Sequence, residues 1–528
     1  MPPRPLRYWT RCLCLAAGLV AAFATTTPLA NAQNRGRLAR NPRADLERFQ
    51  KQHAELHAAF ARQLEELAQS CEAQNLSLEA SEIRKLAEPV DTRTLQMDPL
   101  PSAVQLEIPL SLPAHEREWR TRLRKYREDY AKELYLLSRR VLSAGYVSYA
   151  YDLVREVALQ DSDHSAARRL LGYERLGNEW VTPFAAYMLR RKHVWHDTFG
   201  WLPQDHVERY EKGERYLKPR WISAAQEAEI RRDFEHAWEI RTDHYRIRTN
   251  HSLETGVELG KQLEDFYRIF FQTFAGFFNT RDQLQRLFSG TDSRSTNRMD
   301  PFEIHYYRSR DEYNQRLRSK IAQPIEITTG LYLSGDRVAY FFDDPSGDAE
   351  ARTTLFHEAT HQLFAETRPS RQSVGMRGNF WIIEGIACYM ESFQRHGSRF
   401  SLGNPEYIRF RAAQYRYVTD NYYIPLRKFA AMGMNEFQSD MNISKNYSQA
   451  SGLAHFFMHY DGGIYREALI EHLSDIYSLN PRVRDNPRSL ETLTGVEYEE
   501  LDRQYGEYIS QLATVPSASE ASTLIPTN

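Results

Sequence analysis

Cysteine is scarce in this chain, with four residues among 528. Cys12 and Cys14 lie near the start, and Cys71 and Cys388 are far apart in the sequence. We therefore expect no disulfide framework of the kind that small exported domains use in place of a large core. Hydrophobic residues make up 41% of the chain and aromatic residues 12%, which is enough for packed cores to provide the stability.

Long apolar runs are also missing. Beyond residue 32, no segment reaches the roughly 18 consecutive apolar residues that cross a bilayer. At the start of the chain, arginines precede an apolar run of 11 residues, Leu13–Phe23, and the small-residue sequence Ala30-Asn31-Ala32 follows. This pattern predicts a signal peptide over residues 1–32. We expect the mature chain to be exported to the periplasm or the extracellular space, without a transmembrane segment.

A third absence is an excess of charge of either sign. The 68 basic and 70 acidic residues leave a formal net charge of −2. The chain as a whole is therefore attracted neither to nucleic acid nor to an anionic membrane. The basic run from Arg117 to Arg127 is interrupted by acidic residues, as is typical of a solvated helix face. We predict no nucleic-acid partner.

The length predicts about two or three domains. Residues 33–225 are predicted to form a mostly helical N-terminal region. Apolar spacing there predicts a helical hairpin that turns at Ala144-Gly145, similar to one tetratricopeptide repeat, and an extended solenoid is not indicated. Residues 178–213 are interpreted as irregular. A helical region of this kind is a candidate surface for a protein partner.

Residues 235–512 have the pattern of a second, mixed domain. Short segments with β-type alternation are interspersed with helical segments, in the order strand, helix, strand, helix, hairpin, helix. We predict an α+β fold, with a small mixed sheet and active-site helices followed by a helical lower subdomain. Residues 513–528 are predicted to be a disordered tail.

The strongest chemical motif is His-Glu-Ala-Thr-His at residues 357–361. Residues four apart lie on one face of a helix, so His357 and His361 can bind one metal ion. Glu358 projects beside that face, where a general base is needed. Glu384 is the predicted third ligand, because a carboxylate inside an apolar helical segment is costly unless it is paired or coordinated. It follows His361 by 23 residues, which is far enough for a loop and a second helix to return to the metal. Two imidazoles and one carboxylate, with one position left for water, are a hydrolytic zinc site.

Other residues compete for or support this site. Glu391 lies on the same helix face as Glu384, and either orients a ligand or is an ordinary surface glutamate. His53 and His57 are also four apart, but no third ligand is near them in the sequence. His193, His196 and His206 are interpreted as core or surface histidines.

The two metal motifs carry a family resemblance. His-Glu-Ala-Thr-His followed by Trp-Ile-Ile-Glu-Gly-Ile-Ala-Cys-Tyr-Met-Glu resembles the gluzincin metallopeptidases, and its second part resembles a segment of the M1-type aminopeptidases. The chain lacks their Gly-Ala-Met-Glu-Asn element, which recognises a free amino end. It is most similar to exported bacterial proteins of a domain-of-unknown-function family, the 1570 family, which have a peptidase-like core. This resemblance covers roughly residues 235–512 and implies zinc ligation by His357, His361 and Glu384, with Glu358 as the base.

Gluzincins also use a Tyr or His from the lower subdomain to stabilise the oxyanion. By this resemblance Tyr447 is the first candidate and His455 the second, and the alternative for Tyr447 is ordinary packing. The implied function is hydrolysis of peptide bonds in a peptide or protein substrate, with an extended substrate lying along the strand Val338–Phe342. Two alternatives remain: a non-catalytic zinc-containing binding or scaffold protein, and a zinc amidase acting on a non-peptide or cell-wall amide.

Overall fold

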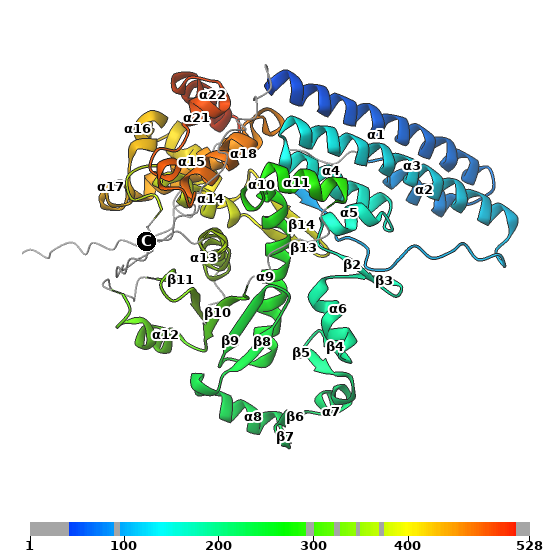
Figure 1. Ribbon diagram of the computed structural model, residues 1–528, viewed down its shortest axis with the longest axis horizontal. Coiled ribbons are helices and arrows are strands. Elements are labelled where there is room, and N and C mark those ends of the chain that lie inside the picture. The colour runs from blue at the N-terminus through cyan, green and yellow to red at the C-terminus, as the bar shows by residue number, and fades with distance from the viewer. Residues whose placement is uncertain are drawn as a thin grey trace, which may run out of the picture.

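The computed structural model describes residues 42–88, 95–291, 300–321, 328–344, 349–368 and 374–513. The predicted signal peptide and almost all of the predicted tail lie outside these ranges. The described residues form a mixed α+β structure that is mainly helical with small sheets (Figure 1), which confirms the predicted class. In the part that is described, no helix combines the length and the apolar character needed to cross a membrane.

The N-terminal helices pack on a core of their own. They are α1 (Pro42–Glu72), α2 (Ser77–Lys85), α3 (Ala114–Ala144), α4 (Val147–Gln160) and α5 (Ser165–Leu170). The helices α1 and α3 have 31 residues each, or about 46 Å, and extend to one side of the molecule (Figure 1). The chain turns from α3 to α4 at Gly145, whose φ of 103° favours glycine, so the hairpin turn lies where the sequence predicts it.

The histidine pair on α1 belongs to this core. His53 is bonded through Nε2 to Glu156 at 2.9 Å and through Nδ1 to the Tyr149 hydroxyl at 3.1 Å. Both ring nitrogens are therefore occupied by α4. The ring of His57 lies against Tyr130 of α3. These contacts support the interpretation that the pair is structural.

Residues 174–231 differ from the prediction, because they are regular. Three hairpins, each followed by a short helix, make up this fully described stretch. The elements are β2 (Glu174–Leu176), β3 (Glu179–Val181), α6 (Pro183–Arg190), β4 (His193–His196), β5 (Gly200–Pro203), η1 (Gln204–His206), α7 (Val207–Glu211), β6 (Glu214–Leu217), β7 (Arg220–Ser223) and α8 (Ala224–Arg231). In each hairpin the second strand has Trp followed by an aliphatic residue, at Trp180, Trp201 and Trp221. This spacing of about 20 residues is a sequence signal for the repeat, and the N-terminal region predicted as mostly helical therefore also contains these hairpins.

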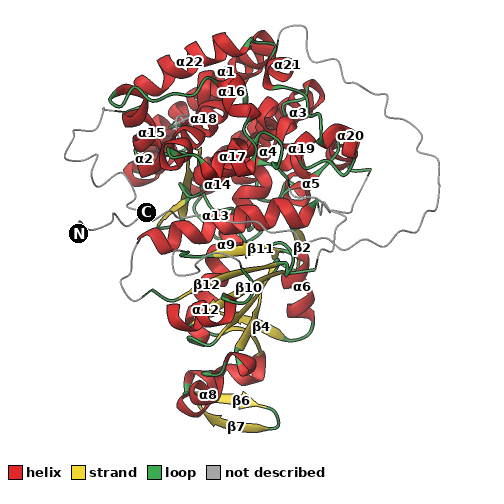
Figure 2. Cartoon of the chain, turned by 90° about the vertical axis from the view of Figure 1, so that its left-hand side faces the viewer, coloured by secondary structure: helices red, strands yellow, loops and turns green. Residues whose placement is uncertain are grey.

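A five-stranded sheet forms the centre of the second half within the described residues (Figure 2). Its order is β11-β12-β10-β9-β8, from β8 (Trp238–Arg241), β9 (Tyr245–Thr249), β10 (Phe302–Tyr307), β11 (Leu331–Leu333) and β12 (Val338–Phe342). The strands β9, β10 and β12 are parallel, whereas β8 and β11 run antiparallel at the two edges. The predicted strand Val338–Phe342 is therefore internal, and the edge next to it is β11.

The sheet is buried on both faces. In β12 the side chains alternate: Ala339 and Phe341 belong to the main core, and Tyr340 and Phe342 belong to a smaller core on the other face. The smaller core is completed by η2 (Phe234–His236) and α12 (Arg310–Leu317). The main core is covered by α9 (Leu253–Thr273), α10 (Ala275–Phe278) and α13 (Ala349–Thr367). The phenylalanines Phe266, Phe270, Phe274 and Phe277 of α9, α10 and the residue between them are buried there.

Helices from the C-terminal part lie over α13 (Figure 2). They are α14 (Phe380–Met390), α15 (Ile408–Val418), α16 (Leu426–Ala431), α17 (Met434–Ser439), α18 (Ile443–Gly463), α19 (Arg466–Ile476), α20 (Pro481–Arg484), α21 (Leu490–Thr494) and α22 (Tyr498–Ser510). The longest, α18, packs against α14 and α15 and breaks near its end at Asp461, where φ is 48°. The helix α13 is thus held between the sheet and this helical part.

The two predicted regions share structure. The strand β1 (Leu95–Met97) pairs with β14 (Arg399–Leu402), which also pairs with β13 (Gln394–His396). Side chains of α10 and α11 (Arg281–Ser289) complete the core of the N-terminal helices. The break in α18 is held by α1, because Gln50 donates to Gly462 O at 3.0 Å and Arg43 pairs with Asp461 at 2.6 Å. The N-terminal region is therefore packed into the second half of the chain.

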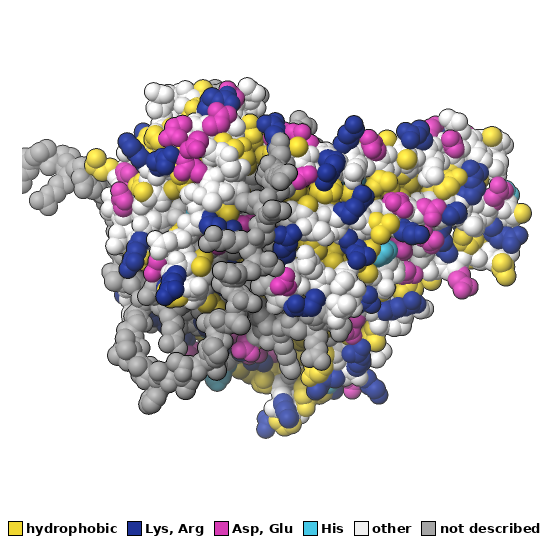
Figure 3. Space-filling view, turned by 45° about the horizontal axis from the view of Figure 1, so that its top comes forward, with side chains coloured by type: hydrophobic (Ala, Val, Ile, Leu, Met, Phe, Trp, Pro, Cys, Tyr) yellow, Lys and Arg dark blue, Asp and Glu magenta, His cyan; other side chains and the backbone are white. Residues whose placement is uncertain are grey.

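The charge distribution agrees with the near-neutral total. On the face shown in Figure 3, Lys and Arg side chains are interspersed with Asp and Glu over the N-terminal helices. Ion pairs of opposite charge one helical turn apart occur on α3, between Arg120 and Glu116 and between Lys125 and Asp129. This is the solvated helix face predicted from the alternating charges.

Candidate metal centre and active site

The helix α13 carries the His-Glu-x-x-His motif at the centre of the molecule. Its residues from 355 to 364 are all buried, with Phe356 stacked on Phe266 and Phe364 against Phe270 of α9. His357 and His361 lie one turn apart and point the same way, with their Nε2 atoms 3.1 Å apart. The packing of α13 therefore holds the two imidazoles side by side.

The helix α14 brings Glu384 to these histidines. Its close approach to α18 depends on Gly385, because a Cβ at this position would lie 2.6 Å from Ala450 O. Glu384 Oε2 is 3.5 Å from His357 Nε2 and 3.8 Å from His361 Nε2. We refer to His357, His361 and Glu384 as the metal triad.

The geometry of the metal triad fits zinc. With ligand bonds of about 2.0–2.2 Å, a tetrahedral zinc site places its ligand atoms about 3.3 Å apart. The three separations in the metal triad, 3.1, 3.5 and 3.8 Å, lie around this value. Two imidazoles and a carboxylate are also the donor set of hydrolytic zinc sites.

The electrostatics of the metal triad point to a bound cation. Glu384 is 3% exposed, and its Oε2 has no hydrogen-bond partner among the described residues. Burial raises the pKa of this carboxyl, but the His361 and His357 imidazoles and the Tyr447 hydroxyl outweigh it and hold the pKa below its usual value. Burial lowers the pKa of His361, so its ring favours the neutral form that binds metals. An ionised carboxylate oxygen that faces two imidazoles and has no hydrogen bond among the described residues is an arrangement suited to a metal ligand.

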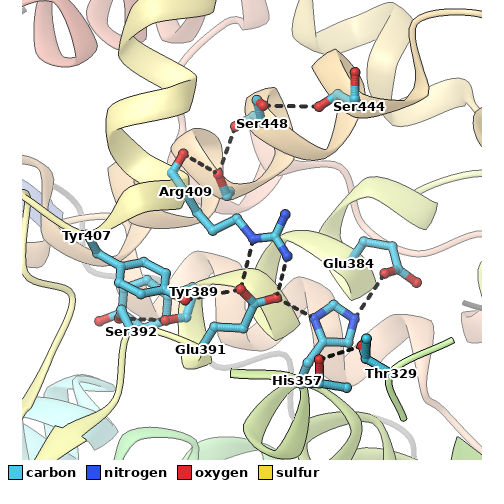
Figure 4. A network of polar contacts seen from close by, with 12 residues as sticks. Thr329, His357, Glu384, Tyr389, Glu391, Ser392, Tyr407, Arg409, Ser444 and Ser448 are labelled. Atoms are coloured by element: carbon cyan, nitrogen blue, oxygen red, sulfur yellow. Dashed lines mark hydrogen bonds and ion pairs between the residues drawn. The ribbon is translucent and has the colours of Figure 1, made fainter. Parts of the chain in front are cut away.

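Behind the metal triad, Glu391 orients His357 (Figure 4). His357 Nδ1 donates to Glu391 Oε1 at 2.8 Å, so the other ring nitrogen, Nε2, faces His361 and Glu384. Arg409 of α15 donates to both oxygens of Glu391, at 2.8 and 3.2 Å, and the Tyr407 hydroxyl donates at 3.2 Å. Burial would raise the pKa of Glu391, but the charge of Arg409 and the hydrogen bonds lower it to about 2. Glu391 is therefore not a surface residue.

A second group of potential ligands shares His357. Cys388, Glu391 and His357 also lie close together and are buried. Glu391 is already paired with Arg409, so a cation there would meet a buried positive charge. Burial raises the pKa of the Cys388 thiol, which keeps it protonated. The metal triad is therefore the better site.

Glu358 lies beside the metal triad and contacts the sheet edge. It is 2% exposed, and its Oε2 accepts the backbone N–H of Tyr332 in β11 at 2.8 Å. Its charge also acts on the neighbouring His361. The structure thus places the predicted base next to two of the predicted ligands.

The two oxyanion candidates have different surroundings. Tyr447 of α18 reaches the metal triad, since its hydroxyl bonds to Glu384. His455, two turns further along α18, donates through Nε2 to Gly403 O at 2.9 Å and accepts at Nδ1 from the Tyr508 hydroxyl at 2.7 Å. Because both ring nitrogens are occupied in the core, His455 must be removed from the candidate site.

Three contributors to the site were missed from the sequence. Arg409 and Tyr407 come from a segment with no motif, and the Tyr332 contact is made by the backbone. No sequence pattern indicates these contacts, because each depends on how distant elements pack. His193, His196 and His206 lie in the hairpin units, and no potential metal group found among the described residues includes them.

Replacing Glu391 tests the support of His357. The Glu391→Gln variant should bind zinc about 10–100-fold more weakly, because His357 loses a charged partner and Arg409 loses its counter-ion. Zinc affinity can be measured by competition with a chromophoric chelator. The control is Glu406→Gln, which should leave the affinity unchanged. Glu406 is paired with Arg411, which lies on the same helix, α15, as Arg409. Equal affinities in the two variants would contradict the role of Glu391.

Comparisons with known proteins do not place the chain in a family. No family model matches the chain, and no curated protein matches it. The functional conclusion therefore depends on the residues and the geometry described above.

Proposed function

We propose that this protein is an exported, zinc-dependent metallopeptidase of the gluzincin type, with Glu358 as the general base. The observation that carries the proposal is the buried metal triad, in which an ionised Glu384 oxygen without a hydrogen-bond partner among the described residues faces two imidazoles. A zinc ion held there would supply Lewis acidity and would lower the pKa of a bound water toward neutrality.

The side chains of the chain have separate roles in this proposal. Glu358 takes a proton from the attacking water and gives it to the leaving amine. Tyr447, beside Glu384, donates a hydrogen bond to the oxyanion that forms on the substrate carbonyl. Arg409, through Glu391, keeps His357 in its orientation.

The zincin-like interpretation of the fold belongs to the same proposal. It is supported by a mixed sheet with an antiparallel edge strand, a motif helix packed on that sheet, and a second helix that provides Glu384. An extended substrate would lie along β11, because β12, the strand favoured from the sequence, is internal.

The experiment that tests the proposal combines a metal assay with peptide digestion. We expect the purified protein to contain about one zinc ion per chain. We expect it to cleave members of a peptide library, to lose this activity in a chelator and to regain it with zinc. Cleavage that persists after complete removal of zinc would contradict the proposal. Bound zinc without any cleavage would favour a scaffold role, and cleavage of cell-wall amides alone would favour the amidase.

A further inference from the structure

The edge strand β11 makes a contact that peptide hydrolysis does not by itself require. The Tyr332 N–H donates to Glu358 Oε2 at 2.8 Å, and both residues are at most 2% exposed. A backbone amide of the sheet is thus bonded to the side chain proposed as the general base.

The strand pairing explains why this amide is available. β11 pairs with β12 in an antiparallel register, with Leu331 opposite Tyr340 and Leu333 opposite Val338. In such a pair the N–H groups alternate between the partner strand and the open side. Tyr332, between the two leucines, directs its N–H to the open edge, where α13 brings Glu358. Its side chain is buried in the main core, which anchors the strand at this residue.

The short distance between β11 and α13 is built into the sequence. Gly330 precedes the strand, and a Cβ there would lie 2.7 Å from Thr354 Cγ2 and 2.8 Å from Phe341 Cδ1. The hydroxyls of Thr329 and Thr354 are hydrogen-bonded at 2.8 Å, which joins the start of β11 to α13. A larger residue at Gly330 would therefore collide with side chains of both α13 and β12.

We propose that the Tyr332 amide is a positioning group for Glu358, an inference that rests on the proposed function. The amide fixes the carboxylate by holding its Oε2 atom. A fixed carboxylate needs no reorganisation when the proton moves, which is how preorganised groups lower a barrier. An extended substrate on β11 also finds the Tyr332 N–H occupied, so the ladder that it forms with this strand is interrupted beside the base.

Hydrogen exchange at the Tyr332 amide tests the contact without any need for activity. Exchange is measured in the full-length protein by mass spectrometry with residue-resolved fragmentation. We expect slow exchange in the wild type and in Glu358→Gln, whose amide oxygen still accepts the bond. In Glu358→Ala we expect exchange about tenfold faster or more. The amides of Leu331 and Leu333 are the internal control and should be unchanged. Equal rates at Tyr332 in the wild type and Glu358→Ala would overturn the inference.

A backbone substitution tests the positioning role. Replacing Tyr332 by its α-hydroxy acid analogue keeps the side chain and removes only the N–H. We expect kcat to fall about tenfold, with KM and zinc content unchanged. The matched control is the same substitution at Leu333, which should leave kcat near the wild-type value. An unchanged kcat at position 332 would overturn the inference. If neither the wild type nor the two substituted proteins hydrolyse any peptide, the proposed function fails. The exchange experiment still decides whether the contact exists.

Discussion

The Glu358→Gln variant is expected to keep its zinc while kcat for peptide cleavage falls about a thousandfold. Glutamine has the same shape and can still accept the Tyr332 N–H, so the metal triad and the edge strand should stay in place. It cannot take a proton from water, and the step that depends on the base is therefore lost. Single-turnover cleavage of a peptide found in the library digest measures the rate, and elemental analysis measures the zinc.

A buried glutamate on the same helix is the control for this experiment. Glu366, two turns after Glu358, accepts hydrogen bonds from Gln362 at 2.9 Å and from Arg337 at 3.0 Å. The Glu366→Gln variant should keep most of its activity, because this carboxylate is bonded away from the metal triad. Wild-type turnover in Glu358→Gln would exclude Glu358 as the base, and loss of zinc would mean that the residue also supports the metal.

The second large effect is expected at Glu384. The Glu384→Gln variant should bind zinc more than about 100-fold more weakly, since it loses a metal ligand, whereas loss of a residue that only orients a ligand costs about 10–100-fold. The charge of Glu384 is also the one that both imidazoles face. Isothermal titration with zinc measures the affinity directly.

Thermal unfolding gives an independent measure of the same loss. A ligand at a hundredfold excess over its Kd stabilises the folded state by about 2.7 kcal/mol. We expect zinc to raise the Tm of the wild type and of Glu366→Gln, and to leave the Tm of Glu384→Gln nearly unchanged. An equal rise in all three proteins would show that zinc binds elsewhere.

The sequence alone determined the features that depend on local spacing. His357 and His361 are four residues apart, so a helix places them on one face whatever surrounds it. Glu384 was recognised because a carboxylate in an apolar helix needs a partner. The alternating and helical patterns of residues 238–367 predicted the order of strands and helices that the fold contains. The repeated Trp spacing of the hairpin units is also present in the sequence. The strands of these units are only three or four residues long, which is too short for an alternating pattern to stand out, so residues 178–213 are interpreted as irregular from the sequence.

Only the tertiary structure decided which distant residues surround the site. Ala450 reaches Gly385 because α18 packs on α14, and Arg409 reaches Glu391 because α15 packs on α18. His455 shares a helix with Tyr447, yet two further turns place it among Gly403 and Tyr508, away from the metal triad. The sheet order made β11, not β12, the edge beside Glu358. These contacts join segments that are separate in the sequence, so they follow from the packing of whole elements and not from any local pattern.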